Sequence, residues 1–239
     1  MSRSEQKVLE QLEPEGLAPH GPKWQQRKSS QTRVAILEAT IDCLEKHGYS
    51  QTTMQLIAEV AKISRGAMTH HYTSKQELIS AVIDYLFYKR MEVFVERIGH
   101  LTDSQRVEEN LGIEEAWESY FTREYKAYLE LGIAARTDAE LQLIFTPKAQ
   151  RYDRMWRTEQ LRVFPEWRDK PELLEHATDF CQAVFEGLVF NRPIWNNPGR
   201  EAMLRAILAD VIRQLRDGTL KLPSKKDVEK FRGPRNKKK

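Results

Sequence analysis

Two very short helical segments, joined by about three residues, constrain this chain more than any other feature of its sequence. The first runs from about residue 52 to 61 and the second from about 65 to 72. Helices of this length are not stable alone in water. They make sense as one supersecondary unit held by a further helix, so residues 52–72 predict a helix-turn-helix.

Capping signals mark where these segments begin. Thr52, with Gln55 three residues on, has the form of a capping box, and Ser64 is placed to cap the second segment. A further capping box, Ser74 with Glu77, opens a helix behind the motif. The sequence therefore predicts three successive helix starts within about 25 residues.

The helix that pins the motif is expected just before it. Ser30 is a good N-cap, and Gly48 supplies a left-handed stop. Between them an apolar stripe recurs at steps of three and four residues, at Val34, Leu37, Ile41 and Leu44.

The second short helix has the exposed residues that a groove-binding helix needs. Such a helix lies in the major groove with its N-terminal residues near base edges. Its candidate contact positions are small or polar, namely Arg65, Gly66, Ala67, Thr69 and His70. The arginine is long enough for a guanine edge or a phosphate. Residues 23–75 hold eight Lys/Arg against four Asp/Glu, which favours a polyanionic partner for this part of the chain.

A series of residues within Arg33–Leu86 forms an ordered pattern, namely Ile36-Leu37, Gly48-Tyr49, Thr52-Thr53, Ile57-Ala58, Ala61, Ile63-Ser64, Gly66, His71, Tyr72, Ser74-Lys75 and Leu78. This pattern resembles the N-terminal domain of the TetR family of transcriptional regulators. It is filled in order, almost without gaps, over about a quarter of the chain.

This resemblance implies roles for single residues. Thr53 and Lys75 would hold DNA phosphates, each from a helix N-terminus. Arg65, Ala67 and His70 would face bases or the nearby backbone.

The family pattern also bears on three further positions of the second short helix. Met68 and Tyr72 stand where the family keeps apolar residues, so they are assigned to the core. Thr69 stands in place of a tyrosine whose hydroxyl reaches a phosphate; threonine is shorter, so His70 or His71 would replace that contact. A packed, hydrogen-bonded role for His71 is equally open.

The rest of the chain predicts an all-α body. Helical periodicity covers 114–128, 138–164, 171–191 and 199–217. The domain organisation expected is a flexible N-terminal arm at 1–28, the helix-turn-helix domain at 29–75, an effector-binding and dimerisation domain at 76–218, and a basic, disordered tail at 219–239.

The last two predicted helices are apolar on more than one side, so each needs more than one partner. The resemblance to the TetR family implies that these helices pair with their copies in a homodimer. The residues expected at that interface are Phe180, Val184, Leu188, Leu204, Ile207 and Val211.

Aromatic residues crowd the body between 86 and 190. Rings at helical spacing form either plain core or the wall of a ligand pocket, which in this architecture lies inside the bundle. The pocket candidates are Trp117, Phe121, Tyr125, Phe145, Trp156 and Phe185, and they favour a moderately sized apolar or aromatic effector.

Other classes of function find no support in the residues. No nucleophile elbow, phosphate loop or metal-ligand spacing is found, so we expect no enzyme activity, metal or cofactor. No apolar run approaches the ~20 residues of a membrane helix, and the expected location is cytoplasmic.

The function predicted is therefore a ligand-responsive repressor that binds a near-palindromic, double-stranded DNA operator as a dimer. Two alternatives stay open. One is a DNA-binding regulator of the same fold with no small-molecule effector, and the other is an all-helical enzyme or scaffold.

Overall fold

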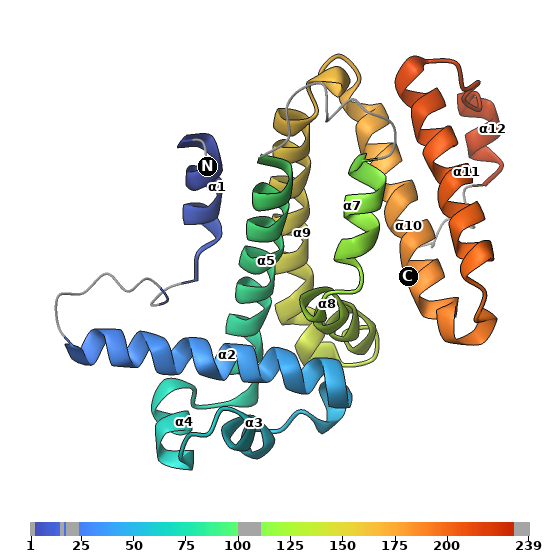
Figure 1. The fold of residues 1–239 in the computed structure, drawn as a ribbon. Coiled ribbons are helices and arrows are strands. Elements are labelled where there is room, and N and C mark those ends of the chain that lie inside the picture. The colour runs from blue at the N-terminus through green and yellow to red at the C-terminus, as the bar shows by residue number, and fades with distance from the viewer. Residues whose placement is uncertain (1–2, 15–16, 18–23, 100–110, 232–239) are drawn as a thin grey trace, which may run out of the picture. The chain divides into compact units, whose positions relative to one another are not determined.

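The computed structural model describes residues 3–14, 17, 24–99 and 111–231, and every regular element within these ranges is a helix (Figure 1). The all-α class is confirmed. The elements are α1 (Arg3–Leu12), α2 (Trp24–Gln51), α3 (Met54–Val60), α4 (Arg65–His71), α5 (Lys75–Gly99), α7 (Leu111–Ser119), α8 (Arg123–Ala134), α9 (Ala139–Val163), the 3-10 turn η1 (Pro165–Trp167), α10 (Pro171–Trp195), α11 (Pro198–Asp217) and α12 (Lys225–Glu229).

The chain divides into two compact units, Met1–Pro165 and Glu166–Lys239. In the first unit, one hydrophobic core joins the helix-turn-helix to the helices behind it. Ile57 of α3 and Met68 of α4 lie in the same cluster as residues of α2, α5, α8 and α9. The two short helices thus gain from tertiary packing the stability that their length denies them.

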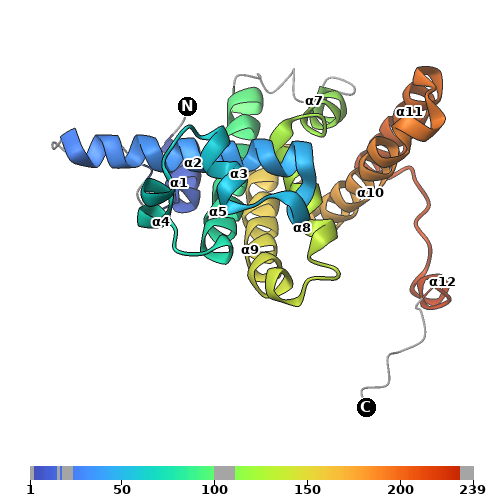
Figure 2. The same ribbon diagram turned by 90° about the horizontal axis from the view of Figure 1, so that it is seen from below.

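Helices α2, α5, α8 and α9 form the frame of this unit. Helix α2 crosses the end of α5, and α5 runs beside α9, as both ribbon views show (Figures 1 and 2). The α2–α8 contact is the most extensive between any two described helices. Because α2 also covers α3, it lies between the helix-turn-helix and the rest of the unit.

The predicted stop at Gly48 is confirmed. This glycine has φ 74°, which interrupts α2 before its last residues. Its carbonyl accepts hydrogen bonds from the Thr52 hydroxyl at 2.7 Å and the Thr52 N–H at 3.2 Å. The predicted beginning after Ser30 is wrong, since α2 begins at Trp24.

The N-terminal arm expected at 1–28 also contains regular structure in its described part. Helix α1 lies at Arg3–Leu12, where Leu9 is buried in the core and Arg151 donates to the Gln11 carbonyl at 3.1 Å. A ten-residue helix owes its stability to such docking. The prolines and glycines that follow α1 interrupt the sustained periodicity that would have indicated a helix.

Two other boundaries differ from the sequence prediction. The helix expected over 114–128 is broken, because α7 ends at Ser119 and Thr122 caps α8 by accepting from the Tyr125 N–H at 3.2 Å. The tail expected to lack structure contains the short helix α12, capped by Ser224. Part of that predicted tail, 232–239, lies outside the described residues.

The second unit contains a helical hairpin. Asn196 ends α10 in a left-handed conformation, and Asn197 caps α11 by accepting from the Arg200 N–H at 3.1 Å. At the other end of the hairpin the Lys170 ammonium donates to the Arg216 carbonyl at 2.7 Å. None of the described helices is long and apolar enough to cross a membrane.

The packing of α3 makes a stability prediction. Ile57→Ala removes a fully buried side chain from the shared core and should lower the free energy of unfolding by about 2–5 kcal/mol, measured by urea denaturation. Val60→Ala, at an exposed position of the same helix, should change it by no more than about 0.5 kcal/mol. Equal effects would show that α3 does not depend on the core.

Candidate nucleic-acid interface

Helix α3 begins one residue later than its sequence signal indicates. Thr53 is the N-cap, and its hydroxyl accepts from the Leu56 N–H at 3.1 Å. Thr52, the predicted cap, is instead fully buried and bonded to Gly48. The correction leaves Thr53 exposed at a helix N-terminus, a position where backbone N–H groups favour an anion.

The turn between α3 and α4 is tightly closed. Lys62 adopts φ 54°, and the Ile63 N–H donates to the Ala58 carbonyl at 3.0 Å. Ser64 then caps α4 by accepting from the Ala67 N–H at 3.1 Å, as the sequence predicts. These bonds fix the angle at which α4 leaves α3.

Helix α4 has one buried and one open face. Met68 and Tyr72 are buried, as predicted. Of the candidate contact residues on α4, most are exposed and Ala67 is half-buried; the exposed ones are Arg65, Gly66, Thr69 and His70. The structure therefore leaves these polar and small residues of α4 free to approach a groove.

Arg65 is oriented from the neighbouring helix. Its guanidinium donates to the Gln55 side-chain oxygen at 2.9 Å, and the Gln55 amide donates to Glu59 at 3.0 Å. Gln55 is a residue that the sequence reasoning used only as a capping signal. These two hydrogen bonds hold the guanidinium against α3 and leave its other N–H donors available.

The hydroxyl of Thr69 points back to its own helix. It donates to the Arg65 carbonyl at 3.0 Å and lies 3.2 Å from the Gly66 carbonyl. The short side chain of Thr69 is therefore already engaged within α4.

Lys75, the first residue of α5, is held by Tyr49. Its ammonium donates to the Tyr49 carbonyl at 2.8 Å and lies 4.0 Å from the centre of the tyrosine ring. Burial lowers the pKa of Lys75, an effect that Asp138 opposes. An ammonium has three donors, so this anchor positions the charge and leaves further donors available.

His71 differs from the exposed residues beside it. It is half-buried and, with Tyr72 and Arg33, lines a cavity of about 600 Å³. Burial lowers its pKa, and the nearby His70 and Arg33 lower it further. This geometry favours a packed role for His71 over a contact with DNA.

Three of the six pocket candidates, Tyr125, Phe145 and Trp156, belong to one aromatic cluster in the first unit. Tyr128 lies 5.7 Å from both Tyr125 and Phe145. Trp156 lies 5.9 Å from Tyr152, which connects to Tyr128 through Phe87. Trp117 and Phe121 contact each other, with ring centres 4.8 Å apart, and Phe185 is a buried residue of the second unit.

The structure adds one residue, Arg90, that the sequence analysis did not identify. Arg90 of α5 lies over the rings of Tyr125, Tyr128 and Tyr152. On its own helix it reads as an ordinary charged position, so only the meeting of three helices identifies it.

The six dimer candidates lie on α10 and α11 with unequal exposure. Phe180 and Ile207 are exposed, and Val184, Leu204 and Val211 are half-buried. Leu188 is only 2% exposed and is already covered within the single chain. Further exposed apolar residues extend this hairpin surface, namely Phe190, Ile194 and Met203.

Comparison with known proteins identifies relatives of the N-terminal part. Residues 36–82 match a family described as bacterial regulatory proteins, tetR family. The transcriptional regulator TtgR of Pseudomonas putida is 39% identical over 59 residues, which are 25% of this chain and 28% of TtgR. The regulator CymR of Pseudomonas putida is 25% identical over 118 residues, 49% of this chain and 58% of CymR. The matches thus span less than two thirds of either relative.

Solved structures share the fold over more of the chain. A TetR-family regulator from Cytophaga hutchinsonii has a TM-score of 0.59 at 15% identity, covering 82% of this chain and 98% of that one. A TetR-family regulator from Rhodococcus sp. has 0.58 at 18%, covering 78% and 100%. The multidrug binding protein EbrR, complexed with imidazole, has 0.53 at 15%, covering 82% and 98%. At these identities the likeness establishes the fold.

The pKa shift of His71 predicts a pH dependence. Because the folded state lowers the pKa below 6.5, the unfolded chain takes up this proton first, and stability is lost as the pH falls through 6.5 toward the folded-state pKa. His71→Gln should flatten this part of the curve of unfolding free energy against pH. An unchanged curve, with His70→Gln as the exposed control, would contradict the assignment.

Proposed function

We propose that this chain, as a member of the TetR family of bacterial regulatory proteins, binds a near-palindromic DNA operator as a homodimer. It releases the operator when a small molecule occupies the helical body. The observation that carries the proposal is the open face of α4, presented on a capped and tightly packed helix-turn-helix.

The interface proposed for DNA has two kinds of contact. Arg65, at the N-terminal end of α4, would read a base edge from the major groove. Thr53 and Lys75, at the N-termini of α3 and α5, would hold phosphates on either side. Phosphate contacts set the register of the helix, and base contacts supply the sequence preference. Binding to the chromosome would place the protein in the cytoplasm.

The proposed dimer would form through the hairpin of α10 and α11. This surface exposes Phe180, Ile207 and other large apolar side chains, which favours a protein partner. A second copy suits the function, because one short helix reads few base pairs and a two-fold dimer reads two half-sites. The bound recognition helices would lie about 34–36 Å apart, one turn of DNA.

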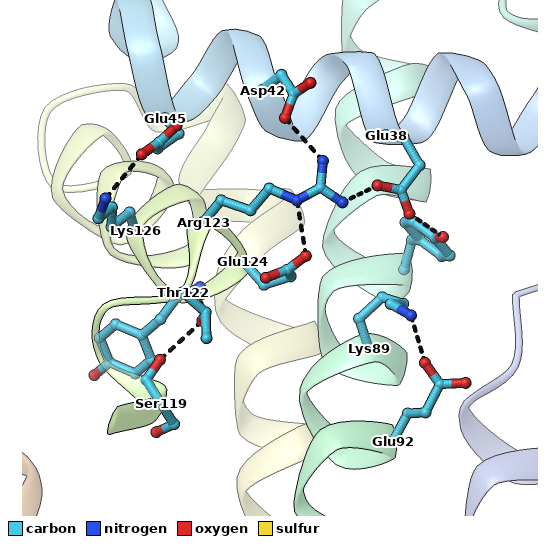
Figure 3. A network of polar contacts seen from close by, with 12 residues as sticks. Glu38, Asp42, Glu45, Lys89, Glu92, Ser119, Thr122, Arg123, Glu124 and Lys126 are labelled. Carbon is cyan, nitrogen blue, oxygen red and sulfur yellow. Dashed lines mark hydrogen bonds and ion pairs between the residues drawn. The ribbon is translucent and has the colours of Figure 1, made fainter. Parts of the chain in front are cut away.

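The proposed ligand response uses the contact between α2 and α8. Arg123 of α8 pairs with Glu38 and Asp42 of α2, the latter at 2.8 Å (Figure 3). Lys126 pairs with Glu45 at 2.8 Å in the same interface. A ligand acts only through different affinities for two conformations. A shift of α8 would therefore reach α2 and the helix-turn-helix that α2 covers. The likeness to EbrR, a multidrug binding protein, supports a ligand-binding body.

Two substitutions separate the proposed DNA contacts. Lys75→Ala should weaken binding to all DNA sequences alike and reduce the salt slope by about one, because it removes a phosphate contact. Arg65→Ala should relax the choice at one base position, at a cost of about 1–3 kcal/mol. Footprint titrations at several salt concentrations measure both. Lys7→Ala, an exposed lysine on α1, is the matched control, and operator affinity unchanged in both variants would contradict the interface.

One substitution tests the dimer. Ile207 is 53% exposed in the single chain, so Ile207→Glu should leave the protomer folded while placing a charge in the proposed interface. Sedimentation at micromolar concentration should show a dimer for the native chain and a monomer for the variant. Leu143→Glu, at an exposed apolar position of α9, should remain dimeric. A native chain that sediments only as a monomer would refute the proposal.

A further inference from the structure

Arg90 lies in a cage of tyrosine rings in the first unit. Its guanidinium carbon is 4.3 Å from the ring centre of Tyr128, 4.8 Å from Tyr125 and 5.2 Å from Tyr152. The cage draws on α5, α8 and α9, so three helices contribute to it. Such contacts use the face of each ring to stabilise a cation.

No anion balances this charge within the described part of the chain. Two other cations of the same unit do have carboxylate partners: Arg123 pairs with Glu38 and Asp42, and Lys148 with Asp84. Arg90 has ring contacts alone, and no hydrogen bond or ion pair of its guanidinium is found among the described residues. A guanidinium has five N–H donors, which ring stacking leaves unused. The half-buried guanidinium therefore has N–H donors available for an anionic partner.

Tyr152 brings a second unused donor to the same cage. Its side chain is 6% exposed, and its hydroxyl has no hydrogen-bond partner among the described residues. Burial raises the pKa of this phenol to about 12, although Arg90 opposes the shift, so the hydroxyl stays protonated and can donate. A buried hydroxyl without a partner is rare in native structures and calls for a reason.

The surroundings of the two donors are aromatic. Phe87 stacks on Tyr152 at 4.4 Å between ring centres, and Trp156 lies 5.9 Å from the same ring. Phe145 packs against Tyr128 at 5.7 Å. A ligand that enters here would meet two polar donors and otherwise apolar rings.

We propose that the effector is an organic monoanion, a carboxylate attached to an apolar or aromatic body, bound by the N–H groups of Arg90 and the hydroxyl of Tyr152. The planar guanidinium fork matches a carboxylate, and one cation balances one negative charge. This inference rests on the proposed function, because it names the chemical class of the effector that the helical body would sense.

The cage is also close to the α2–α8 contact. Tyr125 lies two residues after Arg123 in the first turns of α8, and Arg123 pairs with Glu38 and Asp42 of α2. A carboxylate bound by the N–H groups of Arg90 would lie beside the ring of Tyr125 on α8. Any resulting shift of α8 would reach α2 directly.

The experiment compares acids with their neutral isosteres on the full chain without DNA. The probes are 2-naphthoate, 4-phenylbutyrate and decanoate, each with its primary amide, titrated by calorimetry at pH 7. At least one acid should bind roughly tenfold or more tightly than its amide, the scale of a hydrogen bond to a charged group. Arg90→Gln should abolish this preference, and Lys89→Gln, at the neighbouring residue paired with Glu92, should keep it.

Tyr152→Phe keeps the test decisive if the arginine variant fails to fold. It removes only a hydroxyl that has no partner in the described structure, so thermal stability should not fall, while affinity for the acid should drop several-fold. The proposal is overturned if no acid binds at millimolar concentration, if the amides bind equally well, or if Arg90→Gln keeps the preference.

Operator binding by the ligand-free chain is measured separately. If the operator is bound and no acid binds, the ligand inference alone is wrong. If an acid binds in the cage and no DNA sequence is preferred, the proposed function is wrong and the site remains.

Discussion

The packing of α2 between the helix-turn-helix and α8 is the contact on which the rest of the first unit depends. Helices α3 and α4 are too short to be stable by themselves, and their buried residues Ile57 and Met68 join a core that α2 closes. Helix α2 is also held against α8 by ion pairs, because its carboxylates Glu38 and Asp42 pair with Arg123 of α8 (Figure 3). The same helix therefore stabilises the helix-turn-helix and connects it to the body.

Local signals predicted the parts of this structure that local chemistry determines. The Ser64 cap, the left-handed Gly48 and the buried pair Met68 and Tyr72 are each set by a few neighbouring residues, and all are confirmed. One error lies where tertiary contacts decide, since helix α1 is stabilised by the burial of Leu9 in the core. The one-residue shift of the α3 cap has a local cause, because Thr52 is bonded to the carbonyl of Gly48 four residues earlier.

The candidate sites divide in the same way. The exposed residues of α4 could be predicted, because helical spacing and the two buried residues fix which side faces outward. The environment of Arg90 could not, since its rings come from residues 125, 128 and 152, on two other helices. Aromatic residues at helical spacing have no sequence signal that separates a plain core from a cage around a cation.

Helix α5 relates these sites physically. Lys75 stands at its first residue, held by Tyr49, and Arg90 stands fifteen residues further on the same helix, about 22 Å away at 1.5 Å per residue. Both residues stand on one continuous helix, so a movement of α5 at Arg90 would be carried along the helix to Lys75. Because α8 contacts both α5 and α2, a ligand in the cage could act on the helix-turn-helix through α5 and, by way of α8, through α2. Coupling between sites requires elements that both sites bias, and in this proposal α5 and α8 are those elements.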